Sequence, residues 1–147
     1  MGIDELKVMK LSTRSRYGTR IVLELARHFG GDPIQVSEIA RVQNIPVKYL
    51  EQLIRTLKKA ELIRSVRGSK GGHQLNEDPS DITVGYIVRL FEGQTDLVAC
   101  VSAPEKCDMA DECRVRKVWR DATNAMYAKL DGITIADLLC EPVQPGC

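Results

Sequence analysis

The stretch that decides the fold is VKYLEQLIRTLKKAELIRSVRGSKGGHQL, residues 47 to 75. Its first half repeats apolar residues at helical spacing, and these share one face: Tyr49, Leu50, Leu53, Ile54 and Leu57. Its second half has two short strand-like runs around RGSKGG, whose glycines allow a tight hairpin. A basic hairpin directly after such a helix is a wing. An ordinary hairpin with a solvated tip is the alternative, and Arg67 and Lys70 at the tip favour the wing.

The residues before this stretch predict two further helices. Residues 13–29 carry apolar side chains at helical spacing, and Gly30-Gly31 is a plausible stop. Residues 37–43 suit a short second helix with Ser37 as its N-cap, interrupted by Asn44-Ile45-Pro46, and Pro46 suits the first turn of the third helix. Two short helices joined by a tight turn match the helix-turn-helix pattern, although simple helical bundles share this periodicity.

The residues after the hairpin predict three more helices. Residues 83–92 suit an amphipathic helix capped by Thr83, and residues 134–140 suit a short one capped by Thr134. Between them, residues 114–130 form a long helical pattern. Its apolar positions could pack against another helix of the same chain or of a partner: Val115, Val118, Trp119, Ala122, Met126 and Leu130.

Charge is unevenly distributed along the chain, although the formal net charge is only +1. Residues 48–70 contain seven basic residues against two acidic ones, whereas residues 77–112 contain nine acidic residues against two basic ones. The first segment could therefore lie on phosphates and the second could not.

The third helix and the hairpin together predict a DNA-binding surface. The N-terminal half of a recognition helix usually contacts the major groove, and here it presents Lys48, Tyr49, Glu51, Gln52 and Arg55. A guanidinium suits base edges and narrow minor grooves alike, so Arg67 in the wing is a candidate for either. Phosphate contacts are expected from Arg14, Lys58, Lys59 and Lys70. For each of these proposed DNA-contacting residues taken alone, the alternative is a surface side chain that contacts only solvent.

The chain has five cysteines among its 147 residues, and three of them stand close together as Cys100, Cys107 and Cys113. No apolar run approaches the roughly 20 residues that cross a bilayer, and MGIDELKVMK does not resemble a signal peptide. We therefore expect a cytoplasmic protein without a membrane partner. A reducing compartment favours metal, redox or catalytic use of clustered thiols over disulfides. Cys140 and Cys147 stand apart and are interpreted as incidental.

The spacing C-x6-C-x5-C does not suit structural zinc, which usually has paired knuckles and a fourth ligand. The only histidines, His28 and His73, lie far away in sequence. Iron–sulfur clusters need thiolates and tolerate wider spacing. Acidic neighbours discourage a lone reactive thiolate, which argues against a nucleophilic cysteine. Three incidental thiols are the alternative. We find no nucleophile–base pair, phosphate loop or paired catalytic carboxylates, so neither an enzyme nor a small-molecule substrate is expected.

Over about residues 9–142 the sequence resembles the IscR/NsrR/CymR family of bacterial transcription regulators, through MKLSTRSRYG, PVKYLEQLIRTLKKAELIRSVRG and CRVRKVWRDA. The resemblance implies a mainly α fold: a winged helix-turn-helix domain (9–92) with a two-stranded wing, a cysteine loop (93–114), and a long dimerisation helix with a final helix (115–140). It implies a homodimer on a palindromic promoter site of double-stranded DNA. In that family Lys48, Tyr49, Glu51 and Gln52 fall where the major groove is read.

Family members with three cysteines bind an iron–sulfur cluster, so the resemblance makes Cys100, Cys107 and Cys113 the cluster ligands. A [2Fe–2S] cluster is expected, with [4Fe–4S] as the alternative. The sequence departs from the family at the fourth ligand. Arg116 stands where the iron–sulfur biogenesis regulator has a histidine, and Arg16 where the nitric-oxide-sensing branch has an aspartate. The loop is also one residue longer than in the biogenesis regulator. Loop carboxylates are the nearest candidates on the chain: Glu105, Asp108, Asp111 and Glu112.

The resulting hypothesis is a regulator, most simply a repressor, whose cluster senses redox state, nitric oxide or iron–sulfur status. The alternative is a cluster-free regulator of the same family that senses thiol oxidation or a metabolic partner protein.

Overall fold

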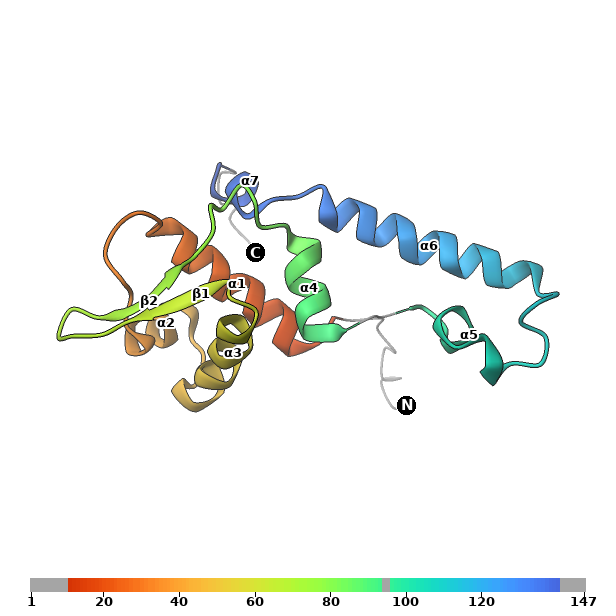
Figure 1. Cartoon of the computed structure of the whole chain (residues 1–147), viewed down its shortest axis with the longest axis horizontal. Coiled ribbons are helices and arrows are strands. Elements are labelled where there is room, and N and C mark those ends of the chain that lie inside the picture. Colours follow the sequence, from red (N-terminus) through yellow and green to blue (C-terminus); the bar gives the residue numbers. More distant parts are fainter. Residues whose placement is uncertain (1–10, 94–95, 141–147) are drawn as a thin grey trace, which may run out of the picture.

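The computed structural model describes residues 11–93 and 96–140. The helices are α1 (Thr13–Arg27), α2 (Val36–Gln43), α3 (Val47–Lys59), α4 (Val84–Glu92), α5 (Ala99–Ser102), the 3₁₀ turn η1 (Pro104–Lys106), α6 (Arg114–Asp131) and α7 (Ile135–Cys140), and the strands are β1 (Ile63–Val66) and β2 (Gly72–Leu75). Figure 1 shows α1 to α4 and the hairpin gathered at one end, with α6 extending away as a long arm and α5 beneath its far end. Among the described helices, none is both long and apolar enough to cross a membrane.

A single core joins the first four helices to the hairpin, and this confirms the mainly α winged helix with a two-stranded wing. The apolar face of α3 supplies Leu50, Leu53 and Leu57, all at most 1% exposed. Within the predicted segment 115–140, α7 returns to the winged helix and packs against α1. Its first residue, Ile135, is fully buried in the same core, and its amide donates to the carbonyl of Ile82 at 2.8 Å.

The helix ends agree with the expected caps in two cases. The hydroxyl of Thr83 accepts a hydrogen bond from the amide of Tyr86 at 3.1 Å, as predicted for the start of α4. The hydroxyl of Thr134 accepts from the amide of Asp137 at 3.1 Å, and the carboxylate of Asp137 accepts from the amide of Thr134. This reciprocal pair is a capping box, and it confirms Thr134 as the cap of α7.

Three other helix ends differ from the expectation. The helix α1 ends at Arg27, two residues before the predicted boundary, and Gly30 follows with a φ of 78°. Ser37 is not an N-cap, because α2 begins one residue earlier and Gln35 occupies that position. Pro46 lies at the cap of α3, just before its first turn. These differences arise because neighbouring candidates for a helix end differ little in local preference.

The hairpin has the expected antiparallel pairing, with Ile63 opposite Leu75 and Val66 opposite Gly72. A Cβ atom at Gly71 would collide with the backbone carbonyl of Val66, so the turn needs glycine there. Nothing in the sequence pattern predicted that a third segment pairs with the hairpin. Ile34 and His73 exchange backbone hydrogen bonds of 3.0 and 2.8 Å, which tie the wing to the loop before α2.

A carboxylate from α4 closes the N-terminus of α1. Oε1 of Glu92 accepts from the amide of Ser12 at 2.7 Å and from the hydroxyl of Ser15. Burial alone would raise the pKa of Glu92, but the hydrogen bonds from Ser12 and Ser15 outweigh it and hold the pKa below its ordinary value. The ionised carboxylate also suits the positive end of the α1 dipole.

Replacing Glu92 with Gln should lower the free energy of unfolding by about 1 kcal/mol at neutral pH. The carboxylate's folded pKa is depressed, so its contribution is present above its unfolded pKa, near 4.3, and is lost as pH falls through the folded value. Urea unfolding of wild type and Glu92→Gln between neutral pH and about pH 3 measures this. The difference between the two should shrink on acidification, and a difference independent of pH would contradict the assignment.

Candidate functional site

The outer face of α3 carries most of the predicted major-groove residues. Lys48, Glu51, Gln52 and Arg55 are all exposed, and their spacing places them in one stripe along the helix. The opposite face of α3 is the buried one described above. The helix therefore presents two cations, a carboxylate and an amide as a single polar surface, which is the set of groups that can read base edges and phosphates.

Tyr49 takes a different position from the other four. It is half-buried and packs against the core, with its ring edge-on to Tyr17 at a centroid distance of 6.0 Å. The guanidinium of Arg20 in turn lies 5.2 Å from the Tyr17 ring centroid. Tyr49 thus helps to fix α3 on α1, and only the half of its side chain that remains exposed is free for another contact.

The wing residues Arg67 and Lys70 lie in the exposed turn between β1 and β2. Lys58 and Lys59 are exposed in the last turn of α3. Arg14 is exposed near the start of α1, which lies beside the end of α4 and away from the hairpin tip in Figure 1. The predicted cations of α3 and the wing thus lie on two elements that contact each other, whereas Arg14 lies near the start of α1, away from the hairpin tip.

A buried polar bridge holds the end of α2 against α1, and nothing in the sequence pattern pointed to it. The side-chain amide of Gln43 donates to the buried carboxylate of Glu24 at 2.8 Å. Arg20 completes the bridge by donating to both the side-chain and the backbone oxygen of Gln43, at 3.0 and 2.6 Å. This network fixes the position of the helix-turn-helix relative to α1.

The three clustered cysteines lie in the turns beneath the far end of α6. Cys100 is half-buried in α5, Cys107 is exposed directly after η1, and Cys113 is half-buried at the N-cap of α6. In the described part of the chain, no three His, Cys, Asp or Glu side chains converge on a point that could hold a metal ion. The three thiols are thus at least partly exposed, and in this conformation they do not converge on one point. Cys140 is exposed in α7, and Cys147 lies outside the described residues.

Arg116 holds this loop together from the first turn of α6. Its Nε donates to the carbonyl of Cys100 at 2.9 Å, and Nη1 donates to the carbonyl of Ala110 at 3.3 Å. The residue that replaces the family histidine therefore ties two parts of the loop through their backbones. Only the comparison with that histidine singled Arg116 out in the sequence, and it did not predict this role.

The arm helix α6 has two different faces. Thr123 and Tyr127 are buried on the face toward α4 and the residues after it. Apolar residues on the other side are exposed: Val115 by 50%, Val118 by 56% and Trp119 by 40%, with exposed Ala122 in the same stripe. An apolar stripe of this size on a helix is an interaction surface rather than a solvated one.

A family model described as "Iron-dependent Transcriptional regulator" and named Rrf2 matches residues 11–141. The chain belongs to the Rrf2 family. The resemblance to the IscR/NsrR/CymR regulators is thereby confirmed, and with it a role as a DNA-binding transcriptional regulator rather than an enzyme.

The chain is similar to several kinds of regulator within the Rrf2 family. Protein rrf2 of Nitratidesulfovibrio vulgaris Hildenborough is 45% identical over 131 residues, covering 89% of this chain and 87% of that protein. The structure of T. potens IscR has a TM-score of 0.72 at 36% identity, covering 92% and 93%. The structure of CymR, titled the global cysteine regulator of B. subtilis, has a TM-score of 0.75 at 37% identity, covering 89% and 96%. The chain is thus similar to both the IscR and the CymR types.

Proposed function

We propose that this Rrf2-family protein is a homodimeric repressor whose affinity for a palindromic operator is set by an iron–sulfur cluster on Cys100, Cys107 and Cys113. The observation that carries the proposal is the position of the cysteine loop. The three thiols lie in the segment that leads into α6, with Cys113 at the N-cap of that helix, and α6 exposes an apolar stripe for a second copy. Because α6 follows the loop directly in the chain, a ligand bound by the loop would lie next to the helix through which the two copies would pack.

The proposed division follows the elements: residues 9–92 bind DNA, residues 93–114 hold the cluster, and residues 115–140 carry the dimerisation helix and the final helix. In the first part Lys48, Tyr49, Glu51, Gln52 and Arg55 read the major groove and Arg67 reads a base edge or minor groove. Arg14, Lys58, Lys59 and Lys70 neutralise phosphates. The exposed stripe of α3 and the exposed wing turn support this assignment.

The donor set suits an iron–sulfur cluster in its chemistry, because cysteine thiolates are the usual ligands of such clusters. Three thiolates leave the fourth ligand position of the cluster open. Carboxylates exposed in the same loop are candidates for it: Glu105, Asp108, Asp111 and Glu112. The described conformation does not yet gather the thiols. Cluster binding therefore requires the loop to close, and the contacts of Arg116 with the carbonyls of Cys100 and Ala110 stabilise the described conformation.

Closure of the loop gives the cluster a way to act on DNA binding. A cluster binds one loop conformation better than the other, so it shifts the population toward that conformation by its difference in affinity. The loop is continuous with α6, and α6 connects through α7 to the core that carries α3. In a dimer, the conformation of the loop would therefore set the distance between the two recognition helices.

A second candidate function is a cluster-free regulator of the same family that responds to thiol oxidation or to a metabolic partner protein. It is supported by the exposure of Cys107, by the lack of a converged donor set among the described residues, and by similarity to CymR as much as to IscR. Electrophoretic mobility assays on one operator separate the two. If the first proposal is right, cluster-loaded and cluster-free protein should differ in operator affinity. If the second is right, the reduced and oxidised forms of the cluster-free protein should differ in operator affinity.

The two kinds of DNA contact predict different mutant behaviour. Arg67→Ala should weaken specific binding by about 1–3 kcal/mol and relax selectivity, because a base contact is lost. Lys59→Ala should weaken binding to all sequences about equally and reduce the salt slope by about one, because a phosphate contact is lost. Fluorescence anisotropy with operator and scrambled DNA at several salt concentrations measures both. Unchanged discrimination by Arg67→Ala would show that the wing does not read sequence.

A further inference from the structure

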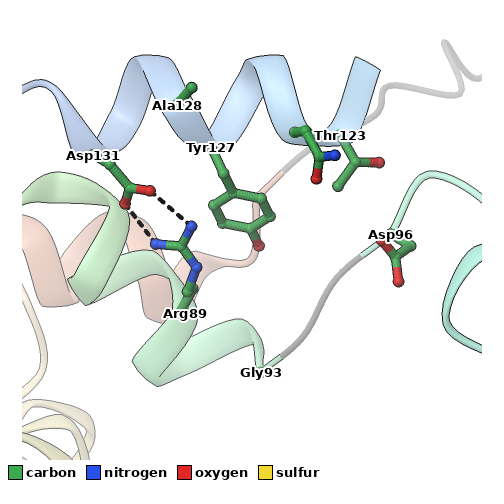
Figure 2. Close-up of a pocket in the computed structure, with 8 residues that line it drawn as sticks. Arg89, Gly93, Asp96, Thr123, Tyr127, Ala128 and Asp131 are labelled. Carbon is green, nitrogen blue, oxygen red and sulfur yellow. Dashed lines mark hydrogen bonds and ion pairs between the residues drawn. The ribbon is translucent and has the colours of Figure 1, made fainter. Parts of the chain in front are cut away.

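A cavity of about 560 Å³ lies between α4 and α6, on the side of α6 that faces the winged helix (Figure 2). Its walls include Arg89 from α4, Asp96 from the segment after α4, and Asn124, Tyr127 and Asp131 from α6. The volume falls in the range of pockets that bind small molecules, about 300–1,000 Å³. Neither the proposed DNA-binding residues nor the three clustered cysteines belong to the wall of this cavity.

Two buried polar atoms at the cavity have no partner within the described residues, namely the hydroxyl of Tyr127 and Oδ2 of Asp96. Tyr127 is only 9% exposed. Buried polar groups in native proteins nearly always have a hydrogen-bond partner, and the few exceptions call for an explanation. Two such atoms beside one cavity indicate an occupant that supplies the missing hydrogen bonds.

Among the described residues of the cavity wall, Arg89 is the one cation, and it is already paired. Asp131 holds it, with Nη1 to Oδ1 at 2.5 Å and Nη2 to Oδ2 at 2.8 Å. The same guanidinium lies 4.3 Å from the Tyr127 ring centroid. Arg89 therefore pairs with Asp131 and the Tyr127 ring, and no salt bridge within the described part of the chain involves the carboxylate of Asp96. An ionised carboxylate only accepts hydrogen bonds, so its partner must be a donor.

We propose that this cavity binds a small molecule with a primary ammonium group on a short carbon chain. An ammonium group has a positive charge and three donors, which is what Asp96 and Tyr127 lack. The carbon chain would lie against the Tyr127 ring and Ala128. The ligand would bridge α4, the start of the cysteine loop at Asp96, and α6.

The site stays accessible when the apolar stripe of α6 is covered. With 3.6 residues per turn, Tyr127 lies roughly opposite Val118 and Ala122 on α6, whereas Trp119, at the edge of the stripe, lies one turn before Thr123. A second copy that packs on the stripe would leave the cavity open. The site also borders the cysteine loop, because the amide of Leu97 donates to the hydroxyl of Thr123 at 3.3 Å and α5 begins two residues later. Occupancy would thus fix the segment that leads to Cys100.

Calorimetric titration and thermal unfolding of the full-length protein test the proposal. The probes are n-butylamine and 1,4-diaminobutane, with n-butanol and butanoate as matched controls that lack the ammonium group. We expect the amines to bind saturably and raise Tm, and the controls to do neither. Asp96→Asn and Tyr127→Phe should each weaken amine binding about tenfold or more. Tyr86→Phe should not, because Tyr86 is 45% exposed on α4 and is not part of the cavity wall.

The ligand-free variants give a second readout. Tyr127→Phe removes only a hydroxyl without a partner, so the ligand-free protein should keep or raise its Tm. A Tm that drops as for the loss of an ordinary buried hydrogen bond would show that the protein itself satisfies this hydroxyl, and would overturn the proposal. Equal binding of amines and controls, amine binding unaffected by both variants, or no saturable amine binding at millimolar concentration would also overturn it.

Discussion

Ala122→Glu is expected to convert the protein to monomers and to abolish specific operator binding. Ala122 is exposed in the single chain and lies in the apolar stripe of α6 with Val118 and Trp119. The substitution therefore leaves the fold of one chain intact. In a dimer packed on that stripe the new carboxylate would be buried without a partner, at a cost of several kcal/mol. Each monomer would then hold a single half-site.

Light scattering with size-exclusion chromatography measures the assembly, and fluorescence anisotropy measures operator affinity. Arg120→Glu is the matched control. It also adds a carboxylate to α6, but two residues earlier and hence on the opposite side of the helix, and it should remain dimeric. An Ala122→Glu protein that is still dimeric would place the interface elsewhere on the molecule.

The second large effect concerns the cysteine loop. Changing Cys100, Cys107 or Cys113 singly to Ala should each remove or severely destabilise the cluster, because two thiolates cannot retain it against chelators and solvent. Cys140→Ala is the matched control, since Cys140 is an exposed thiol of α7 outside the loop. Visible absorbance and iron content of anaerobically isolated single mutants provide the measurement. Cys147→Ala should behave like Cys140→Ala.

The outcome of these mutants also separates the two candidate functions. Loop variants that retain as much iron and colour as wild type would rule out the three-thiol cluster. If wild type and loop variants are all colourless but differ in DNA binding on oxidation, the loop is a thiol sensor.

The winged helix could be read from the sequence because its signals are local. The apolar repeat of α3 and the glycines of RGSKGG each fix an element within a few residues, and a helix followed by a basic hairpin has few other arrangements. The thiols of the loop were visible for the same reason. They are chemically distinctive and lie within one short segment.

The features that sequence could not give depend on contacts between distant residues. Ser12 and Glu92 are 80 positions apart, and Arg89 and Asp131 are 42 apart, so no short pattern contains either pair. The role of Arg116 depends on where two backbone carbonyls of the folded loop lie. The half-burial of Tyr49 depends on Tyr17 in another helix. The cavity between α4 and α6 exists only once the arm has returned along the winged helix.

The most direct test of the cluster is the composition of wild-type protein isolated without oxygen. Iron and acid-labile sulfide are quantified per chain, and the visible spectrum is recorded on the same sample. We expect a coloured protein in which iron and sulfide are present together. It should lose both the colour and its operator affinity or selectivity when the cluster is removed. Anaerobically isolated protein that is colourless and free of iron and sulfide would contradict the cluster proposal.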